Sequence, residues 1–221
     1  HHHLAVEPTS DFIPYFTDSE VRRSGSMTPA QKRKRERLEA AFGRPDPKAV
    51  IKDVAHLLEV VAGSQPRLTI LSDEHKAYPR AIGRLKCQVE HLVTSSRERR
   101  DAHNRLFPVN LADLLLRHSS ANHKRETIAW SKRRQSSAER LAVFVVWRNY
   151  LKGRREKARG SPTPAQARGM LDRRLEVSDV LERRMFVTRT ALPARWQEYY
   201  WGRVRTRALA RQRAHELKYA V

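Results

Sequence analysis

The sequence is poor in cysteine, in acidic side chains and in long apolar runs. Its 221 residues include one cysteine, Cys87, which excludes a disulfide framework and a zinc site built on cysteines. A reducing compartment is therefore expected. The longest apolar run, residues 141–147, is far shorter than the roughly 20 residues that a membrane-spanning helix needs. No signal peptide is visible, and no contact with a membrane is expected.

The shortage of acidic residues leaves a large excess of positive charge. The chain has 45 lysines and arginines against 24 acidic residues, a formal net charge of +21 and a pI of about 11.0. Such an excess attracts polyanions. Because the basic residues are spread along most of the chain, the pattern favours a folded nucleic-acid-binding protein over a neutral domain with a basic tail. A ribosome-associated protein would share this charge pattern.

Composition and length fit one domain of ordinary size with an extension, and the 39% of apolar residues can form a core. Apolar spacing, turn residues and helix caps predict the order of elements. Strands are expected at 4–7, 12–16, 68–73 and 87–93, and helices from 28, at 47–62, at 79–85, from 110 and over 123–152. A linker at 160–164 precedes two or three basic helices that begin near residues 164, 178 and 193. The predicted division is therefore 1–155 and 156–221.

One strand ends in an acidic side chain that has two interpretations. The apolar run 68–72 ends abruptly at Asp73. Burial of an unpaired carboxylate is costly, whereas coordination of a divalent cation makes such a position favourable. In the simpler interpretation, Asp73 only caps the turn that follows the strand.

Several segments between residues 72 and 150 carry distinctive motifs. They read SDEHKAYP at 72–79, HLVTS at 91–95, RLFPVN at 105–110, KRETIAWSK at 124–132, and RL and WRNY within 140–150. Together these segments resemble insertion-sequence transposases with a DDE catalytic core, and the likeness runs from about residue 22 to 150 and more weakly beyond. The resemblance implies an α/β fold with a ribonuclease H-like mixed sheet, followed by a basic helical C-terminal region.

The resemblance also implies a site and a chemistry. Asp73 matches the second metal-binding carboxylate of the family and Glu126 the third. With Mg²⁺ or Mn²⁺ ions, such carboxylates activate a water or a 3′-hydroxyl at a phosphodiester. The implied protein is a bacterial, cytoplasmic, nucleoid-associated transposase that cleaves and joins DNA at transposon ends as a homo-oligomer. The local sequence alone favours a different interpretation, in which Glu126 is a solvated charge on a helix.

The sequence departs from the family pattern at its start. The first catalytic aspartate belongs on a strand before residue 4, and Asp11 and Asp18 are poor substitutes because they lie on or beside the next two strands. We therefore expect the chain to begin inside the catalytic domain, to leave an unpaired edge beside the strand that ends at Asp73, and not to catalyse strand transfer. The alternative function is a non-catalytic basic DNA- or RNA-binding protein, either a decayed transposase or a ribosome-associated factor.

Candidate DNA contacts come from the basic segments. Residues 22–37 are dense in arginine and lysine, two cations lie six and seven positions after Glu126, and three arginines four positions apart form a helical stripe near the C-terminus. The residues chosen as nucleic-acid contacts are Arg22, Arg23, Lys132, Arg133, Arg203, Arg207 and Arg211. Each also has a simpler interpretation as part of a solvated surface. The aromatic residues of 196–201 are either base-stacking groups or a packed helical face.

The stripe Arg203, Arg207 and Arg211 gives a prediction about salt dependence. Each phosphate that a cation neutralises releases counterions, so replacing all three arginines by alanine should lower the slope of log K against log salt by about 2–3. Titration of labelled duplex DNA at several salt concentrations measures this slope. An unchanged slope would remove these arginines from the interface.

Overall fold

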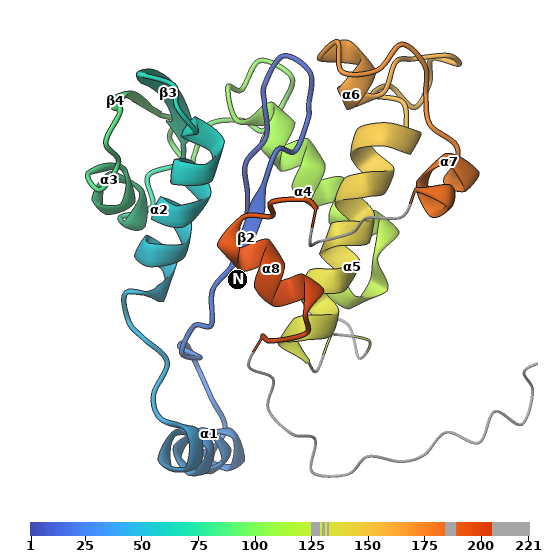
Figure 1. Ribbon diagram of the computed structural model, residues 1–221. Helices are drawn as coiled ribbons and strands as arrows, with labels where there is room; N and C mark the ends of the chain where they lie inside the picture. Colours follow the sequence, from blue (N-terminus) through green and yellow to red (C-terminus); the bar gives the residue numbers. More distant parts are fainter. Residues whose placement is uncertain (125–128, 130, 132, 184–188, 205–221) are drawn as a thin grey trace, which may run out of the picture.

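The computed structural model is a mixed α/β protein in which residues 1–124, 129, 131, 133–183 and 189–204 are described (Figure 1). The strands are short and the helices carry most of the chain. In chain order the elements are β1 (His2–Leu4), β2 (Phe16–Asp18), α1 (Pro29–Phe42), α2 (Ala49–Ala62), β3 (Arg67–Ser72), α3 (Ala77–Ile82), β4 (Gln88–Val93), α4 (Phe107–Ser119), the 3₁₀ turn η1 (Ala121–His123), α5 (Arg134–Val146), the π-helical turn η2 (Trp147–Leu151), α6 (Pro164–Ala167), α7 (Val177–Glu182) and α8 (Ala194–Tyr200).

The strands form two separate pairs within the described residues. β1 is antiparallel to β2, and β3 is parallel to β4 with Ile70 opposite His91. β3 therefore has a strand partner on one side only in this part of the chain. The expected edge left by a missing first strand stays a prediction. The expected α/β class is confirmed, whereas the ribonuclease H-like mixed sheet stays a prediction.

Helix boundaries follow the local signals where these are strong. Thr28 caps α1 through a capping box with Gln31, and Thr163 caps α6 in the same way. Gly63 ends α2 with a φ of 54°, a left-handed conformation that suits glycine. The predicted start of the last helix near residue 193 is also correct, because Pro193 is the N-cap of α8.

Two local predictions are wrong. A helix was expected over 123–152, but α5 begins only at Arg134, whose side chain contacts Asp18 of β2. The predicted strands 4–7 and 12–16 are replaced by β1 and β2, which lie further from the turn. The carboxylate of Glu7 accepts hydrogen bonds from the backbone and side chain of Ser10, so the turn takes up residues expected in the strands.

Two apolar clusters form the core. The first packs α4, α5 and α8 against the β1–β2 pair and contains Ile13, Phe16, Ala112, Leu116, Ala138, Leu141, Phe144, Val145, Tyr199 and Val204. The second packs α2 against β3 and α3 and contains Tyr15, Val54, Ala55, Leu57, Leu58, Ile70 and Ala81. Trp196 of α8 contacts both clusters, so α8 belongs to the same packed body as β2. The predicted division after residue 155 stays a prediction.

The described helices include none that is long and apolar enough to cross a membrane.

The turn between β1 and β2 is attached to η2 by one buried amide. Asn149 is 1% exposed, accepts a hydrogen bond from the backbone nitrogen of Ile13 at 3.0 Å and donates one to its carbonyl oxygen at 2.9 Å. Both backbone groups lie in the interior, where unsatisfied polar atoms are costly. Asn149 therefore fixes the hairpin on the helical part of the protein.

Replacement of Asn149 by alanine should lower the free energy of unfolding by about 2–4 kcal/mol, because a buried donor and a buried acceptor each lose their partner. Urea denaturation measures the change. Asn110→Ala is the matched control, since the half-buried Asn110 side chain has no hydrogen bond to the described residues, and a change within about 0.5 kcal/mol is expected there. Equal effects of the two variants would contradict the assigned role of Asn149.

Candidate metal centre and buried charge cluster

Asp73 lies directly after β3, at the carboxyl end of the parallel pair. It is exposed, and its Oδ1 accepts a hydrogen bond from the backbone nitrogen of His75 at 3.0 Å. This is the capping geometry of the simpler interpretation. Oδ2 accepts no hydrogen bond from the described residues. Glu126 lies outside those residues, so its predicted proximity to Asp73 stays a prediction.

The backbone that presents Asp73 is held by side chains from both strands. The buried hydroxyl of Ser72 donates to the carbonyl oxygen of Asp73 at 2.8 Å and lies 2.8 Å from Nε2 of His91. Because the hydroxyl has one proton, this arrangement requires Nε2 of His91 to be the donor. Glu74 adds a link to the loop after β4 by accepting from the backbone nitrogen and hydroxyl of Ser96, both at 3.1 Å. His91 is half-buried, and its contact with Ser72 connects β4 to β3.

The candidate metal centre is incomplete in the part of the chain that the structure describes. There, no three histidine, cysteine or acidic side chains lie close enough together to hold a metal ion. Asp73 is thus a single exposed carboxylate at a strand end. An ion would need further ligands, for which Glu126 is the candidate from the sequence.

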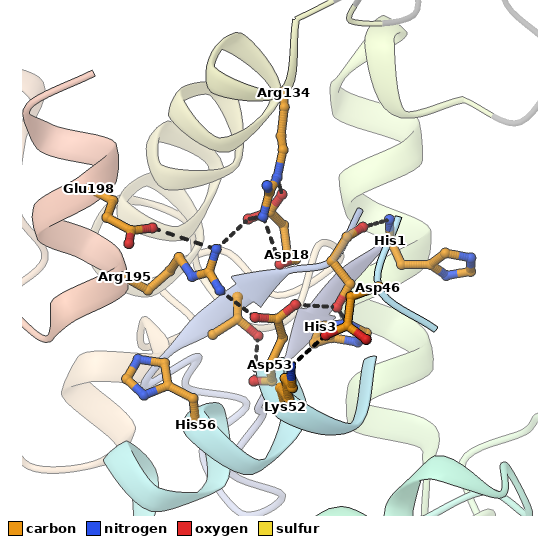
Figure 2. Close-up of polar contacts among 12 residues, drawn as sticks. His1, His3, Asp18, Asp46, Lys52, Asp53, His56, Arg134, Arg195 and Glu198 are labelled. Atoms are coloured by element: carbon orange, nitrogen blue, oxygen red, sulfur yellow. Dashed lines mark hydrogen bonds and ion pairs between the residues drawn. The ribbon is translucent and has the colours of Figure 1, made fainter. Parts of the chain in front are cut away.

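The most deeply buried acidic groups lie elsewhere, in a cluster between β2, α2, α5 and α8 that we term the Asp18–Asp53 cluster (Figure 2). Asp18 is 3% and Asp53 8% exposed. Arg134 of α5 forms an ion pair with Asp18, while Arg195 of α8 pairs with Asp53 and lies 4.0 Å from Asp18. Two arginines therefore neutralise two buried carboxylates.

Hydroxyl and imidazole groups complete the Asp18–Asp53 cluster. Ser19 donates to Oδ2 of Asp53 at 2.7 Å and lies 2.8 Å from Nε2 of His3, which connects the cluster to β1. The phenol of Tyr199 donates to Asp18. Because arginines and hydroxyls occupy these carboxylates, the cluster fastens elements to one another and leaves no open position for a metal.

Burial and hydrogen bonding have opposite effects on these groups. Burial opposes ionisation of Asp18, but hydrogen bonds from Arg134 and Tyr199 outweigh it and hold the pKa of this carboxyl below its usual value. Burial raises the pKa of the Tyr199 phenol, and the neighbouring Asp18 raises it further. Burial lowers the pKa of both His2 and His3 to about 4. The folded protein therefore keeps both imidazoles neutral at pH values where free histidine is charged.

Local sequence patterns do not predict the Asp18–Asp53 cluster, although one signal points to it. Asp53 lies on the same face of α2 as the apolar residues Val54, Leu57 and Leu58. An acidic residue within an apolar stripe needs a buried partner. That partner, Arg195, comes from a helix 142 positions away, which local patterns do not identify.

The predicted DNA contacts have different environments. Arg22 donates to the carboxylate of Glu39 at 2.8 and 3.1 Å, and Arg23 donates to Gln31 at 3.2 Å. Arg133 is half-buried at the N-cap of α5. Arg203 is exposed and lies 5.9 Å from the ring centre of Trp201. The remaining three candidates, Lys132, Arg207 and Arg211, lie outside the described residues.

Of the aromatic residues considered for base stacking, two belong to the core. Tyr199 is buried and stacks on Phe16 with 5.5 Å between ring centres. Trp196 donates from Nε1 to the carbonyl oxygen of Phe16 at 3.1 Å. Tyr200 and Trp201 are about half exposed. The packed-face interpretation therefore holds for the first two residues.

Comparison of the chain with protein-family models, with curated proteins and with solved structures finds no match.

The low pKa values of His2 and His3 predict a stability that depends on pH. In the unfolded chain both imidazoles take up a proton near pH 6.5, whereas the folded chain does so only near pH 4. The free energy of unfolding should be constant above about pH 6.5 and should fall as the pH drops from 6.5 to 4. At pH 5 the loss should be about 2 kcal/mol for each histidine.

Urea denaturation at pH 7 and pH 5 tests this dependence. The double variant His2→Gln/His3→Gln should lose much less stability between the two pH values than the unchanged protein. His103→Gln/His118→Gln, which replaces two exposed histidines, is the matched control and should keep the full dependence. The assignment is wrong if both double variants show the same loss.

Proposed function

We propose that the chain is part of a DDE-type transposase, in which it binds DNA and supplies one metal-binding carboxylate. The observation that carries the proposal is the position of Asp73. In chain order, the antiparallel pair β1–β2 comes first, then α1 and α2, and then the parallel strands β3 and β4. Asp73 comes directly after β3. Ligands of open α/β sheets bind beside the carboxyl ends of their strands. The carboxyl ends of β3 and β4 are level, since Ser72 is opposite Val93.

The charge of the chain supports DNA as the ligand. A net charge of +21 favours a polyanion over a neutral or cationic substrate. Several arginines form ion pairs within the fold and do not face a ligand; Arg134 and Arg195 are examples. Most basic residues of α1 are nevertheless exposed, and remain available for phosphates.

The end of β3 provides one side chain that suits a metal ion, the carboxylate of Asp73. The free Oδ2 of Asp73 is the kind of hard oxygen donor that Mg²⁺ and Mn²⁺ prefer. A bound ion would supply Lewis-acid activation of the phosphodiester and of the attacking oxygen. The protein's part is to hold this carboxylate in place, through the contacts of Ser72 and His91 described above.

A second candidate function is a non-catalytic nucleic-acid-binding protein. The capping geometry of Asp73 favours it, since the hydrogen bond from His75 gives this side chain a structural role without any metal. The two functions share DNA binding and differ in whether a metal at Asp73 strengthens it.

A DNA titration with and without metal separates them. At about 50 mM salt the protein should bind duplex DNA without metal, and the affinity should fall steeply as the salt concentration rises. Addition of Mn²⁺ should strengthen binding because the ion connects Asp73 to a phosphate. Asp73→Asn should abolish that gain while leaving metal-free binding unchanged, whereas Asp172→Asn, at another exposed aspartate, should keep it.

Each outcome has a separate meaning. A gain with Mn²⁺ that is equal in all three proteins would support the non-catalytic function. Undetectable binding at about 50 mM salt, where phosphate-driven binding is normally tight, would contradict both functions.

A further inference from the structure

Helix α1 stands apart from the rest of the protein. Figure 1 shows it below the other elements, joined by one segment from β2 and a second segment to α2. None of its 14 residues is buried. Packing therefore does not explain why this helix forms. Its stability comes from local features, namely the capping box of Thr28 with Gln31 and Pro29 in the first turn.

The inner face of α1 holds the helix against residues 20–23. Glu39 receives two hydrogen bonds from Arg22, and Nε of Arg35 lies 3.7 Å from the same carboxylate. Arg35 also lies within 3.5 Å of the carbonyl oxygen of Arg23. These contacts occupy Arg22 and Arg35 and orient the helix. They make both arginines poor candidates for phosphate contacts.

The outer face of α1 is positively charged and unpaired. Arg33, Lys34 and Arg37 are all exposed, and they have no ion-pair partner among the described residues. The helical period puts these three side chains on one side, opposite Arg35 and Glu39. Ala30, Ala40 and Ala41 also lie on that side, and the exposed Glu36 lies at its border. The short side chains of the alanines let a partner approach the helix closely, which long side chains would prevent.

We propose that this outer face of α1, made by Arg33, Lys34 and Arg37, is a docking surface for the phosphate backbone of duplex DNA. Arg33 and Arg37 are about 6 Å apart along the helix axis, from a rise of about 1.5 Å per residue. Phosphates of one strand repeat every 3.4 Å along the duplex axis, so the two arginines span about two phosphates. The inference rests on the proposed DNA binding and assigns it to one helix.

The assignment explains why a helix without a packed face is present. A helix with no buried residue contributes little hydrophobic stabilisation to the fold. What α1 does provide is a rigid element that holds three cations at fixed spacing, away from the paired arginines of the core. Cations held in place in this way lose less conformational freedom on binding than cations on a loop.

The test compares two triple variants that remove the same charge. Arg33→Ala/Lys34→Ala/Arg37→Ala changes the outer face, and alanine preserves the helix. Arg155→Ala/Lys157→Ala/Arg159→Ala changes two arginines and one lysine in the loop before α6, where these side chains are exposed and have no ion-pair partner among the described residues. Both variants lower the net charge by the same amount, so any difference between them reports position and not total charge.

Titrations of duplex DNA over a range of salt concentrations give the readout. The outer-face variant should lose at least about tenfold in affinity at about 100 mM salt, and its slope of log K against log salt should fall by about 2–3, or about 0.9 for each lost phosphate contact. The loop variant should change the slope by less than about 1. Circular dichroism and the urea midpoint should match those of the unchanged protein, because α1 is not part of the core.

Chemical modification of lysines gives a measurement that needs no variant. Acetylation of Lys34 should slow when duplex DNA is bound, while acetylation of Lys157 should proceed at an unchanged rate. Equal protection of both lysines would mean that binding is diffuse and would overturn the assignment to α1.

The failures of the two proposals are distinguishable. If the unchanged protein does not bind duplex DNA, the proposed function fails and the docking surface with it. If it binds but both triple variants behave alike, only the assignment to α1 is wrong. If the outer-face variant loses affinity for duplex RNA of the same sequence but not for DNA, the surface serves RNA and the DNA proposal for this helix is overturned.

Discussion

The ion pairs of Asp18 and Asp53 with Arg134 and Arg195 are the contacts on which the arrangement of the elements depends. The strands do not form one continuous sheet, so backbone hydrogen bonds do not connect the β1–β2 pair to the β3–β4 pair within the described residues. The Asp18–Asp53 cluster instead joins β2, α2, α5 and α8 through side chains (Figure 2). Removal of one partner from such a buried pair leaves an uncompensated charge, which is strongly destabilising. The side chains of the cluster therefore hold these elements together, as backbone hydrogen bonds do in a larger sheet.

The apolar packing is built around the same elements. Trp196 of α8 contacts both core clusters, and its neighbour Arg195 enters the Asp18–Asp53 cluster. One short helix thus supplies an aromatic ring and a cation to the point where the two halves of the core meet. Its sequence position, far from β2 and α2, means that these contacts close long loops and form at a large cost in chain entropy. Good packing and full neutralisation of the charges offset that cost.

Sequence patterns predicted those parts of the protein that are determined locally. Thr28 and Gly63 mark helix ends through their own hydrogen bonds or backbone conformation, and the β-branched run before Asp73 forms β3 as expected. The positions of β1 and β2 were predicted wrongly because the turn held by Glu7 and Ser10 takes up residues expected in the strands. The start of α5 was also predicted wrongly, and there the contact is between distant residues. Arg134 and Asp18 are 116 positions apart, and nothing in either local sequence identifies the other. For the candidate site, the strand-end position of Asp73 was predicted, while its hydrogen bond to His75 decides its present environment.

The structure divides the arginines of this chain into two groups, and this changes what the net charge of +21 means. Arg134, Arg148 and Arg195 are directed at Asp18, Asp11 and Asp53 and serve the fold. Arg148 is 1% exposed, and burial lowers the pKa of its guanidinium even beside Asp11. Such residues add to the formal charge, but their charge is paired with carboxylates within the fold. The charge that a polyanion meets belongs to exposed side chains such as Arg33 and Arg37, which stand on an element with no buried residue. A basic composition therefore predicts the class of partner, and the pairing of each cation predicts where on the surface that partner binds.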